Sequence, residues 1–356
     1  MAEKVLMKGN EAIAEAALHA GCRHYFGYPI TPQTEIAAYM AKRMPKIGGT
    51  FLQAESEIAA INMVYGVASA GYRVMTSSSS PGISLKSEGL SYLAGADLPS
   101  LVVNVQRGGP GLGGIQPSQS DYFQATKGGG HGDFRMIVLA PASVQEMAEL
   151  TVKGFELADT YRMTAMILAD GTMGQMMEPV SLDALEVKPA PDKPWATTGT
   201  KLQRPHNIVN SLSLIPEELQ KFNFARYERY RTIEEKEAMW EEYMMEDAEI
   251  CIAAFGIAAR VSKNAINEAR KQGIKVGMIR PITLWPFPKD AFRRAADQVN
   301  SFISVELSMG QMIEDVRLAS ECRKPVTLCN RAGGMIPSPD QVLEAIKNAA
   351  KNGGAN

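Results

Sequence analysis

The feature of this sequence that most restricts its fold is a regular alternation between helical segments and short apolar strands. From residue 1 to about residue 182, helical stretches such as "NEAIAEAALHAGC" and "SEIAAINMVYGVASAG" alternate with apolar runs such as "HYFGYPI", "LPSLVVNVQR" and "MTAMILADG". Such alternation is typical of a parallel sheet that is covered by helices on both faces. The pattern returns from residue 248 to residue 356, in runs such as "EICIAAFG" and "NSFISVEL". We therefore predict an α/β fold with two doubly wound parallel-sheet domains.

The segment between the two alternating regions, residues 183–247, has a different character. Pro, Lys and Thr accumulate in "EVKPAPDKPWATTGTKLQRP", and a charged helical stretch, "TIEEKEAMWEEYMMEDA", follows it. This composition predicts a long connection that contains one exposed helix. The expected division is a first domain at 1–182, a linker at 183–247 and a second domain at 248–356.

Composition and charge exclude several classes of protein. The 356 residues carry a formal net charge of −2, and no block of Lys and Arg suggests a nucleic acid or an anionic membrane as a partner. The run "ICIAAFGIAA" is about half the length that a membrane-spanning helix needs. The stretch "MAEKVLMKGNE" lacks the apolar core of a signal peptide. We expect a soluble cytoplasmic protein.

The four cysteines, Cys22, Cys251, Cys322 and Cys329, include no C-x-x-C pair. This spacing predicts neither a zinc site nor an iron–sulfur cluster built from this chain alone. We expect reduced and mostly buried thiols, and no metal site on the chain.

Two prolines constrain the backbone around Thr31 in "HYFGYPITPQTEI". Pro29 fixes its own φ, and Pro32 biases Thr31 toward extended geometry. Thr31 is then expected at the carboxyl end of a parallel strand and beside a helix N-terminus, where doubly wound sheets bind ligands. The alternative is a helix N-cap with Pro32 as the first helical residue, and the local sequence alone favours this alternative.

Two glutamates, Glu55 and Glu57, stand where an extended segment becomes a helix in "FLQAESEIAAINMVYG". Carboxylates in a first helical turn commonly complement the helix dipole. The surrounding residues are apolar, however, and a carboxyl group in such a setting could share a proton with a ligand nitrogen. Periodicity does not choose between the two glutamates.

Arg107 ends the apolar strand in "VVNVQRGGPGLGG", again at the expected carboxyl edge of a sheet. An arginine at this edge can bind a carboxylate with two hydrogen bonds. The alternative is a surface cation on a loop, and the pattern favours neither.

The same stretch contains Gly109, Gly111 and Gly114, which match the G-x-G-x-x-G pattern of dinucleotide binding. That pattern must open a helix directly after its strand, whereas Arg107 and Gly108 intervene here. NAD binding is therefore weakly supported, and we expect the glycine loop to close over a ligand or to meet a partner. His131 lies in a second glycine-rich stretch, "TKGGGHGDF", and its role stays open.

Two cofactor motifs are missing from the sequence. It contains no "GDG" with an Asn pair further along, and no "GxxxxGK" phosphate loop. If the protein uses a diphosphate cofactor, we expect the Mg²⁺ and phosphate site on another chain.

Several long stretches together resemble the α subunit of 2-oxoacid:ferredoxin oxidoreductases. They are "YPITPQTE" at 28–35, "QAESEIAAINMVYGVASAG" at 53–71, "TSSSSPGISLKSEGLSYLAGADLPSLVVNVQRGGP" at 76–110 and "QSDYFQATKGGGHGDF" at 119–134. Further stretches, "LAPASVQEM", "MIRPITLWPFP" and "AGGMIPSPDQV", are most similar to the 2-oxoisovalerate branch. The resemblance covers nearly the whole chain except the linker.

The resemblance implies roles for single residues. The glutamate that binds the pyrimidine ring of thiamine diphosphate falls on Glu57, whose carboxyl group would hydrogen-bond a ring nitrogen and so take part in catalysis. Thr31 matches the residue that hydrogen-bonds the substrate, and Arg107 matches the residue that pairs with its carboxylate. Pro29 and Ile30 are expected to contact the cofactor.

The resemblance also implies an architecture and partners. The first domain would bind the pyrimidine half of thiamine diphosphate, and the second would be similar to the C-terminal domain of transketolase-like enzymes. A β subunit would carry the diphosphate and Mg²⁺ site, and a γ subunit and a ferredoxin-like subunit, with [4Fe-4S] clusters in the partner chains, would complete the complex. The reaction would be oxidative decarboxylation of a branched-chain 2-oxoacid to CO2 and acyl-coenzyme A, with electrons passing to ferredoxin.

Three alternatives stay open. The substrate could be another 2-oxoacid, above all 2-oxoglutarate. The chain could be a non-catalytic scaffold subunit of such a complex, or a nicotinamide dehydrogenase that uses the Gly109–Gly114 loop.

Overall fold

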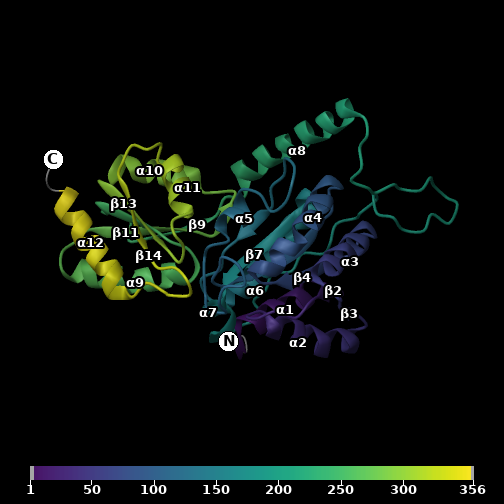
Figure 1. The fold of residues 1–356 in the computed structure, drawn as a ribbon, viewed down its shortest axis with the longest axis horizontal. Coiled ribbons are helices and arrows are strands. Elements are labelled where there is room, and N and C mark those ends of the chain that lie inside the picture. The colour runs from purple at the N-terminus through teal and green to yellow at the C-terminus, as the bar shows by residue number, and fades with distance from the viewer. Residues whose placement is uncertain (1–3, 354–356) are drawn as a thin grey trace.

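The computed structural model describes residues 4–353 and contains two α/β units joined by a long connection (Figure 1). The first unit is built on a seven-stranded sheet in the order β12-β6-β7-β5-β4-β2-β3. The second unit is built on a five-stranded sheet in the order β14-β13-β10-β11-β9. All strand pairs within these sheets are parallel except those made by the edge strands β12 and β9. The predicted fold class is confirmed.

The elements of the first unit follow the alternation that the sequence predicts. In chain order they are β1 (Val5–Lys8), α1 (Gly9–His19), β2 (His24–Gly27), α2 (Thr34–Arg43), a 3-10 turn (Met44–Ile47), β3 (Thr50–Gln53), α3 (Glu57–Ser69), β4 (Val74–Ser78), α4 (Ser80–Gly95), β5 (Ser100–Gln106), α5 (Tyr122–Thr126), β6 (Ile137–Leu139), α6 (Val144–Tyr161), β7 (Thr164–Asp170), α7 (Gly171–Gln175) and β8 (Met177–Val180).

The connection and the second unit follow. They contain α8 (Pro216–Lys236), β9 (Trp240–Tyr243), β10 (Ile250–Ala253), α9 (Gly256–Lys271), β11 (Val276–Pro281), β12 (Thr283–Trp285), α10 (Lys289–Gln298), β13 (Ser301–Glu306), α11 (Met312–Ala319), β14 (Val326–Asn330) and α12 (Pro339–Gly353).

The core of the first unit lies on both faces of its central strands. Every residue of β5 and of β7 is buried, which explains why these strands read as continuous apolar runs. Helices α1 and α6 pack against each other, and α3 packs against α4. The first strand, β1, does not join this sheet but pairs antiparallel with β8.

Two edge strands cross the expected domain boundaries. β9 lies in the linker, in the stretch at 232–248 that the sequence predicted to be helical; that prediction is wrong at 240–243, where the chain forms a strand that pairs with β11 in the second sheet. β12 lies in the second alternating region, yet it pairs antiparallel with β6 in the first sheet. The boundaries at 182/183 and 247/248 stay a prediction.

The long connection lies mostly outside both units. Between Val180 and Pro216 the chain forms no helix or strand, and it extends away from the body of the molecule before α8 returns to it (Figure 1). α8 packs on the first unit through Arg226, Tyr230 and Ile233. Within residues 4–353, no helix is both long and apolar enough to cross a bilayer.

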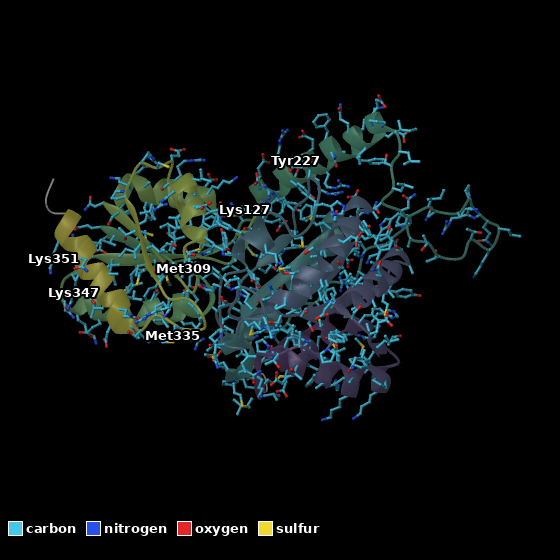
Figure 2. The ribbon with its side chains drawn as sticks, viewed as in Figure 1. Lys127, Tyr227, Met309, Met335, Lys347 and Lys351 are labelled. Carbon is cyan, nitrogen blue, oxygen red and sulfur yellow. The ribbon has the colours of Figure 1, made fainter. Side chains whose placement is uncertain are left out.

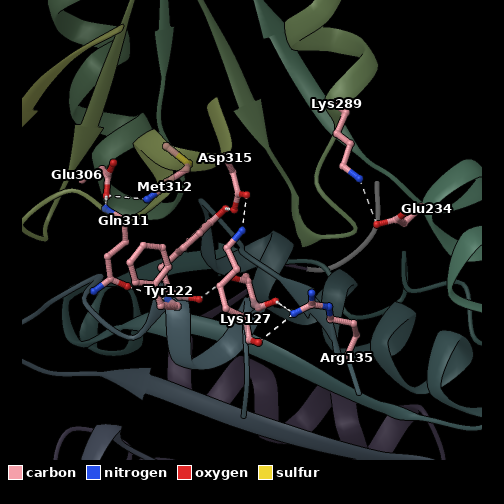
Figure 3. A network of polar contacts seen from close by, with 11 residues as sticks. Tyr122, Lys127, Arg135, Glu234, Lys289, Glu306, Gln311, Met312 and Asp315 are labelled. Carbon is pink, nitrogen blue, oxygen red and sulfur yellow. Dashed lines mark hydrogen bonds and ion pairs between the residues drawn. The ribbon is translucent and has the colours of Figure 1, made fainter. Parts of the chain in front are cut away.

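Polar contacts join the two units where α5 faces α11 (Figure 3). The Tyr122 hydroxyl donates a 2.5 Å hydrogen bond to Asp315, and Lys127 forms an ion pair with the same carboxylate. Figure 2 places Lys127 at this junction, while Met309 and Met335 lie on the surface of the second unit, 78% and 57% exposed. These contacts therefore hold the α5 segment of the first unit against α11 of the second unit.

Candidate active site

Four neighbouring strands of the first sheet end at one edge, and each expected site residue follows one of them. Strands β5, β4, β2 and β3 are adjacent and parallel. Arg107 follows β5, the loop with Thr31 follows β2, and Glu57 begins the helix after β3. The carboxyl edge of a doubly wound sheet is where such folds bind ligands.

Glu57 is the buried member of the glutamate pair. Its side chain lies at the first position of α3, is 5% exposed, and follows Ser56, whose hydroxyl caps the helix by accepting from the Ala59 amide. Glu55 is exposed. Since Ser56 already caps the helix, the buried carboxyl group of Glu57 is available for another contact.

The first turn of α4 makes room for this carboxyl group. A Cβ atom added at Gly82 would lie 2.5 Å from Glu57 Oε1 and 2.0 Å from Ser78 Oγ. Any side chain at position 82 would therefore displace Glu57 or Ser78. No side chain among the described residues donates a hydrogen bond to the Glu57 carboxylate, although it is almost completely buried.

Arg107 is buried rather than a surface cation, with 8% of the residue exposed. Its Nη1 donates to the Thr31 carbonyl at 2.9 Å, and its Nη2 donates to the Leu112 carbonyl at 3.3 Å. Its backbone N–H donates to Ser80 Oγ at 3.0 Å. The structure thus brings Arg107 and Thr31 together, and Ser80 links Arg107 to the helical turn that contacts Glu57.

The Arg107 guanidinium keeps donors free. Its Nε is buried and has no hydrogen-bond partner among the described residues. A guanidinium has five N–H donors in a planar fork that matches a carboxylate. This geometry suits the binding of a carboxylate ligand.

Thr31 does not cap the following helix, so that sequence-based alternative is wrong. α2 begins at Thr34 and its N-cap is Gln33, and the chain makes a turn at residues 31–32 before the helix starts. Thr31 is exposed on a hollow of about 500 Å³ that Glu35, Ile115 and Gln175 also line. Neither Glu57 nor Arg107 lines this hollow.

A buried chain of hydrogen bonds holds the loop that carries Thr31. Tyr25 and Ser77 share a 2.6 Å hydrogen bond, Ser77 donates to Gln33 Oε1 at 2.5 Å, and Gln33 Nε2 donates to the Tyr28 carbonyl at 3.2 Å. Pro29 is exposed and Ile30 is half-buried. The cofactor contacts expected of these two residues stay predictions.

Sequence reasoning missed a supporting carboxylate, Asp121. Its Oδ2 accepts from Ser80 Oγ at 2.6 Å and from Asn104 Nδ2 at 2.9 Å. Burial raises the pKa of Asp121 above its usual value, and these two hydrogen bonds oppose the rise. Asp121 orients Ser80 and so supports Arg107. Its place in a glycine-flanked loop gave no signal of this role.

Sequence reasoning also missed Lys86, whose side chain is fully buried in α4. Burial lowers the pKa of Lys86 to about 8, and the charge of Glu57 opposes this shift. The sequence did contain a pattern that indicates burial. Lys86 lies among small and apolar residues at helical spacing, with Gly82 four residues before it and Gly89 three residues after it.

The glycine loop after Arg107 does not open a helix. It returns to pair Arg107 with Pro117, and the next helix, α5, has 5 residues. Gly108 packs against the Gly333–Gly334 turn of the second unit. His131 is exposed, and its carbonyl accepts from Ser91 Oγ at 2.7 Å. Within the described residues, no three His, Cys, Asp or Glu side chains group in a way that could hold a metal ion.

These residues fit half of a thiamine diphosphate site. A buried carboxylate without a hydrogen-bond donor, set against a helix turn that only glycine allows, suits a ring nitrogen that carries a proton. The fold and this edge together define a doubly wound α/β protein with a ligand site at the carboxyl edge of its first sheet.

Comparison with known proteins agrees with this class. Residues 15–246 match the family described as pyruvate flavodoxin/ferredoxin oxidoreductase, thiamine diphosphate-binding, and residues 248–342 match core domain II of pyruvate:ferredoxin oxidoreductase. The ketoisovalerate oxidoreductase subunit VorB of Methanothermobacter thermautotrophicus is 53% identical over 97% of both chains.

Two solved structures are similar in fold. One is 2-oxoglutarate:ferredoxin oxidoreductase from Magnetococcus marinus with 2-oxoglutarate, coenzyme A and succinyl-coenzyme A bound, with a TM-score of 0.84, 27% identity, and coverage of 98% of this chain and 65% of that chain. The other is a split-gene transketolase in an inactive tetramer, with a TM-score of 0.63, 12% identity, and coverage of 97% and 98%. The second likeness concerns the fold alone.

The chain belongs to the 2-oxoacid:ferredoxin oxidoreductase family. It is a subunit of an enzyme of this family, so it works with partner subunits. The family, the enzyme class and the thiamine diphosphate-binding domain that the sequence predicted are confirmed.

Proposed function

We propose that this subunit takes part in the oxidative decarboxylation of a branched-chain 2-oxoacid to acyl-coenzyme A and CO2, with reduction of ferredoxin. The observation that carries the proposal is the buried Glu57 carboxylate against Gly82, at the edge where Arg107 also lies. The 53% identity to a ketoisovalerate oxidoreductase subunit supports the choice of a branched-chain substrate.

In this proposal Glu57 accepts a hydrogen bond from a protonated ring nitrogen of the thiamine diphosphate pyrimidine, and this bond keeps the proton on that nitrogen. Held by Glu57, thiamine diphosphate would supply a nucleophilic carbon for the 2-oxo group and a sink for the electron pair left when CO2 departs. Arg107 binds the substrate carboxylate, and Thr31 hydrogen-bonds the substrate. The Asp121–Ser80 contacts keep Arg107 in place.

We further propose that the rest of the site lies on partner chains. A β subunit would hold the cofactor diphosphate and Mg²⁺, and a γ subunit and a ferredoxin-like subunit would complete the complex. The [4Fe-4S] clusters would lie in these partners. Coenzyme A would accept the acyl group, as the coenzyme A-bound relative suggests. A cytoplasmic location stays a prediction.

A substrate panel on the assembled complex tests the substrate. We expect kcat/KM for 3-methyl-2-oxobutanoate to exceed that for 2-oxoglutarate by at least about tenfold, since an apolar pocket that accepts a branched chain leaves a second carboxylate unpaired. The likeness to the 2-oxoglutarate enzyme makes that acid the second candidate. Activity with 2-oxoglutarate alone would remove the branched-chain proposal.

A further inference from the structure

Lys86 is a buried amino group that the proposed chemistry does not use. Its side chain is 0% exposed, and its Nζ has no hydrogen-bond partner within residues 4–353. Lysines are almost never fully buried unless they are paired, because a buried charge without a partner is strongly destabilising. The position of Lys86 therefore calls for a partner with which its charge interacts.

Lys86 lies on the face of α4 that packs against α3, the helix that begins with Glu57. Positions 82, 86 and 89 are spaced by four and three residues, so they share one face of α4. A Cβ at Gly82 would lie 2.5 Å from Glu57 Oε1, and one at Gly89 would lie 2.4 Å from Ile61 Cγ2. Lys86 thus lies between the two points where α4 comes closest to α3.

Glu57 is the residue whose charge acts on Lys86. It is the only acidic or basic residue of α3, where Tyr65 is the other titratable side chain. β5 carries no charged residue, and Asp170 at the end of β7 accepts hydrogen bonds from backbone amides of α7. His131 and Asp133 are exposed on a loop that contacts α4 on another face.

We propose that Lys86 is a positioning residue whose amino group attracts the Glu57 carboxylate and so keeps it in place to hydrogen-bond the thiamine ring. This inference rests on the proposed function. Opposite charges attract each other more strongly in a buried setting of low dielectric constant than in water. Lys86 acts through Glu57 and does not touch the ring itself.

The proposal has a definite pH dependence. Because burial lowers the pKa of Lys86 to about 8, the amino group is mostly charged at pH 7 and mostly neutral at pH 9. The affinity for thiamine diphosphate should therefore fall between these two values. An arginine at this position stays charged throughout, and a methionine is never charged.

The experiment uses the assembled complex after removal of its cofactor and measures thiamine diphosphate binding by calorimetry at pH 7 and pH 9. We expect wild type to bind about tenfold more tightly at pH 7 than at pH 9, because Lys86 loses most of its charge between these two pH values. K86R should bind tightly at both pH values, and K86M should bind weakly at both. K271M, which removes an exposed lysine of α9, is the control and should match wild type.

Two results would overturn the role of Lys86: K86M that binds as wild type does at both pH values, or K86R with the same pH dependence as wild type. The second result decides the question even if K86M does not assemble. Glu57→Gln separates this inference from the proposed function. If it leaves the affinity unchanged, the proposed function itself fails. If it weakens binding while K86M does not, only the role of Lys86 fails.

Discussion

At the scale of single residues, burial distinguishes the candidates that the sequence could not rank. Glu55 and Glu57 are two residues apart where an extended segment becomes a helix, and the sequence pattern does not rank them. In the structure Glu55 is exposed and Glu57 is 5% exposed. The difference arises from α4, whose Gly82 closes over Glu57, and no pattern within the α3 sequence contains that contact.

Replacement of Glu57 by alanine should abolish most turnover. We expect a loss of at least about a hundredfold in the assembled complex, the effect of removing a group that holds a proton in the reaction. The measurement is the rate of ferredoxin reduction with 3-methyl-2-oxobutanoate. Glu55→Ala is the matched control and should keep near-normal turnover. Near-normal turnover for Glu57→Ala would support a non-catalytic scaffold instead.

Replacement of Arg107 by lysine should weaken substrate binding more than it slows chemistry. Lysine keeps the charge, but it cannot bond the Thr31 and Leu112 carbonyls and also present a planar fork to a carboxylate. Steady-state kinetics should show KM for the 2-oxoacid raised by about tenfold or more, with a smaller fall in kcat. An unchanged KM would contradict the assignment of Arg107 to the substrate carboxylate.

At the scale of helices and strands, the alternating pattern predicted the elements well but not all of their partners. The central strands β5 and β7 are buried on both faces, so their apolar runs identify them. The edge strands β9 and β12 are short, and each joins a sheet that its place in the chain does not suggest. Pairing between distant segments leaves little local signal, which is why these two were missed.

The local pattern also predicted some positions in the candidate site and missed others. The positions of Thr31 and Arg107 after their strands followed from the pattern, because carboxyl ends of parallel strands meet at one edge. The start of α2 at Thr34 did not follow, since Pro32 read as a first helical residue. Lys86 did not follow either, because a lysine in a helix is normally on the solvated face.

The contact between α3 and α4 can be tested with paired glycine substitutions. Gly82→Ala should lower both the melting temperature and the affinity for thiamine diphosphate, because its Cβ would lie 2.5 Å from Glu57 Oε1. Gly66→Ala is the control: a Cβ at Gly66 in α3 meets nothing within 4 Å. It should be neutral or stabilising by about 0.5–1 kcal/mol, the helix preference for alanine over glycine. Unchanged affinity in Gly82→Ala would contradict the close packing of this site.

At the scale of the whole molecule, the second unit supports the site of the first. Glu306 is buried and accepts hydrogen bonds from the amides of Gln311, Met312 and Ile313, which fixes the start of α11 (Figure 3). Gln311 Nε2 donates in turn to the Ser120 carbonyl, next to the Asp121 carboxylate that holds Ser80. The two units are therefore joined directly behind the proposed substrate site.

The pH dependence of stability at Asp170 provides a test of the junction between the two units. Burial raises the pKa of Asp170 from 3.8 to about 6, and its partners include the backbone of Ile257 in the second unit. Between these pH values the folded chain keeps a proton that the unfolded chain has lost, so this group destabilises the fold as pH rises. Asp170→Asn cannot ionise but still caps α7. The asparagine NH2 group cannot accept from the Ile257 backbone, so the expected effect is a difference between pH values: relative to pH 4, Asp170→Asn should stabilise the full chain at pH 7.5 by on the order of 2–3 kcal/mol.

The stabilisation should be nearly absent at pH 4, where the Asp170 carboxyl group is protonated in the folded state. Melting temperatures of the wild-type and Asp170→Asn chains at both pH values provide the measurement. An equal change at the two pH values would show that the carboxylate charge is not responsible.

The central claim is that Glu57 binds the pyrimidine ring of a thiamine diphosphate shared with a partner subunit. A high-resolution structure of the assembled complex with this cofactor measures the claim directly. We predict that one carboxylate oxygen of Glu57 lies about 2.6–3.2 Å from a pyrimidine ring nitrogen, at a junction with a partner chain that holds the diphosphate. A pyrimidine ring held without Glu57, or a cofactor site with no partner chain beside it, would contradict the account.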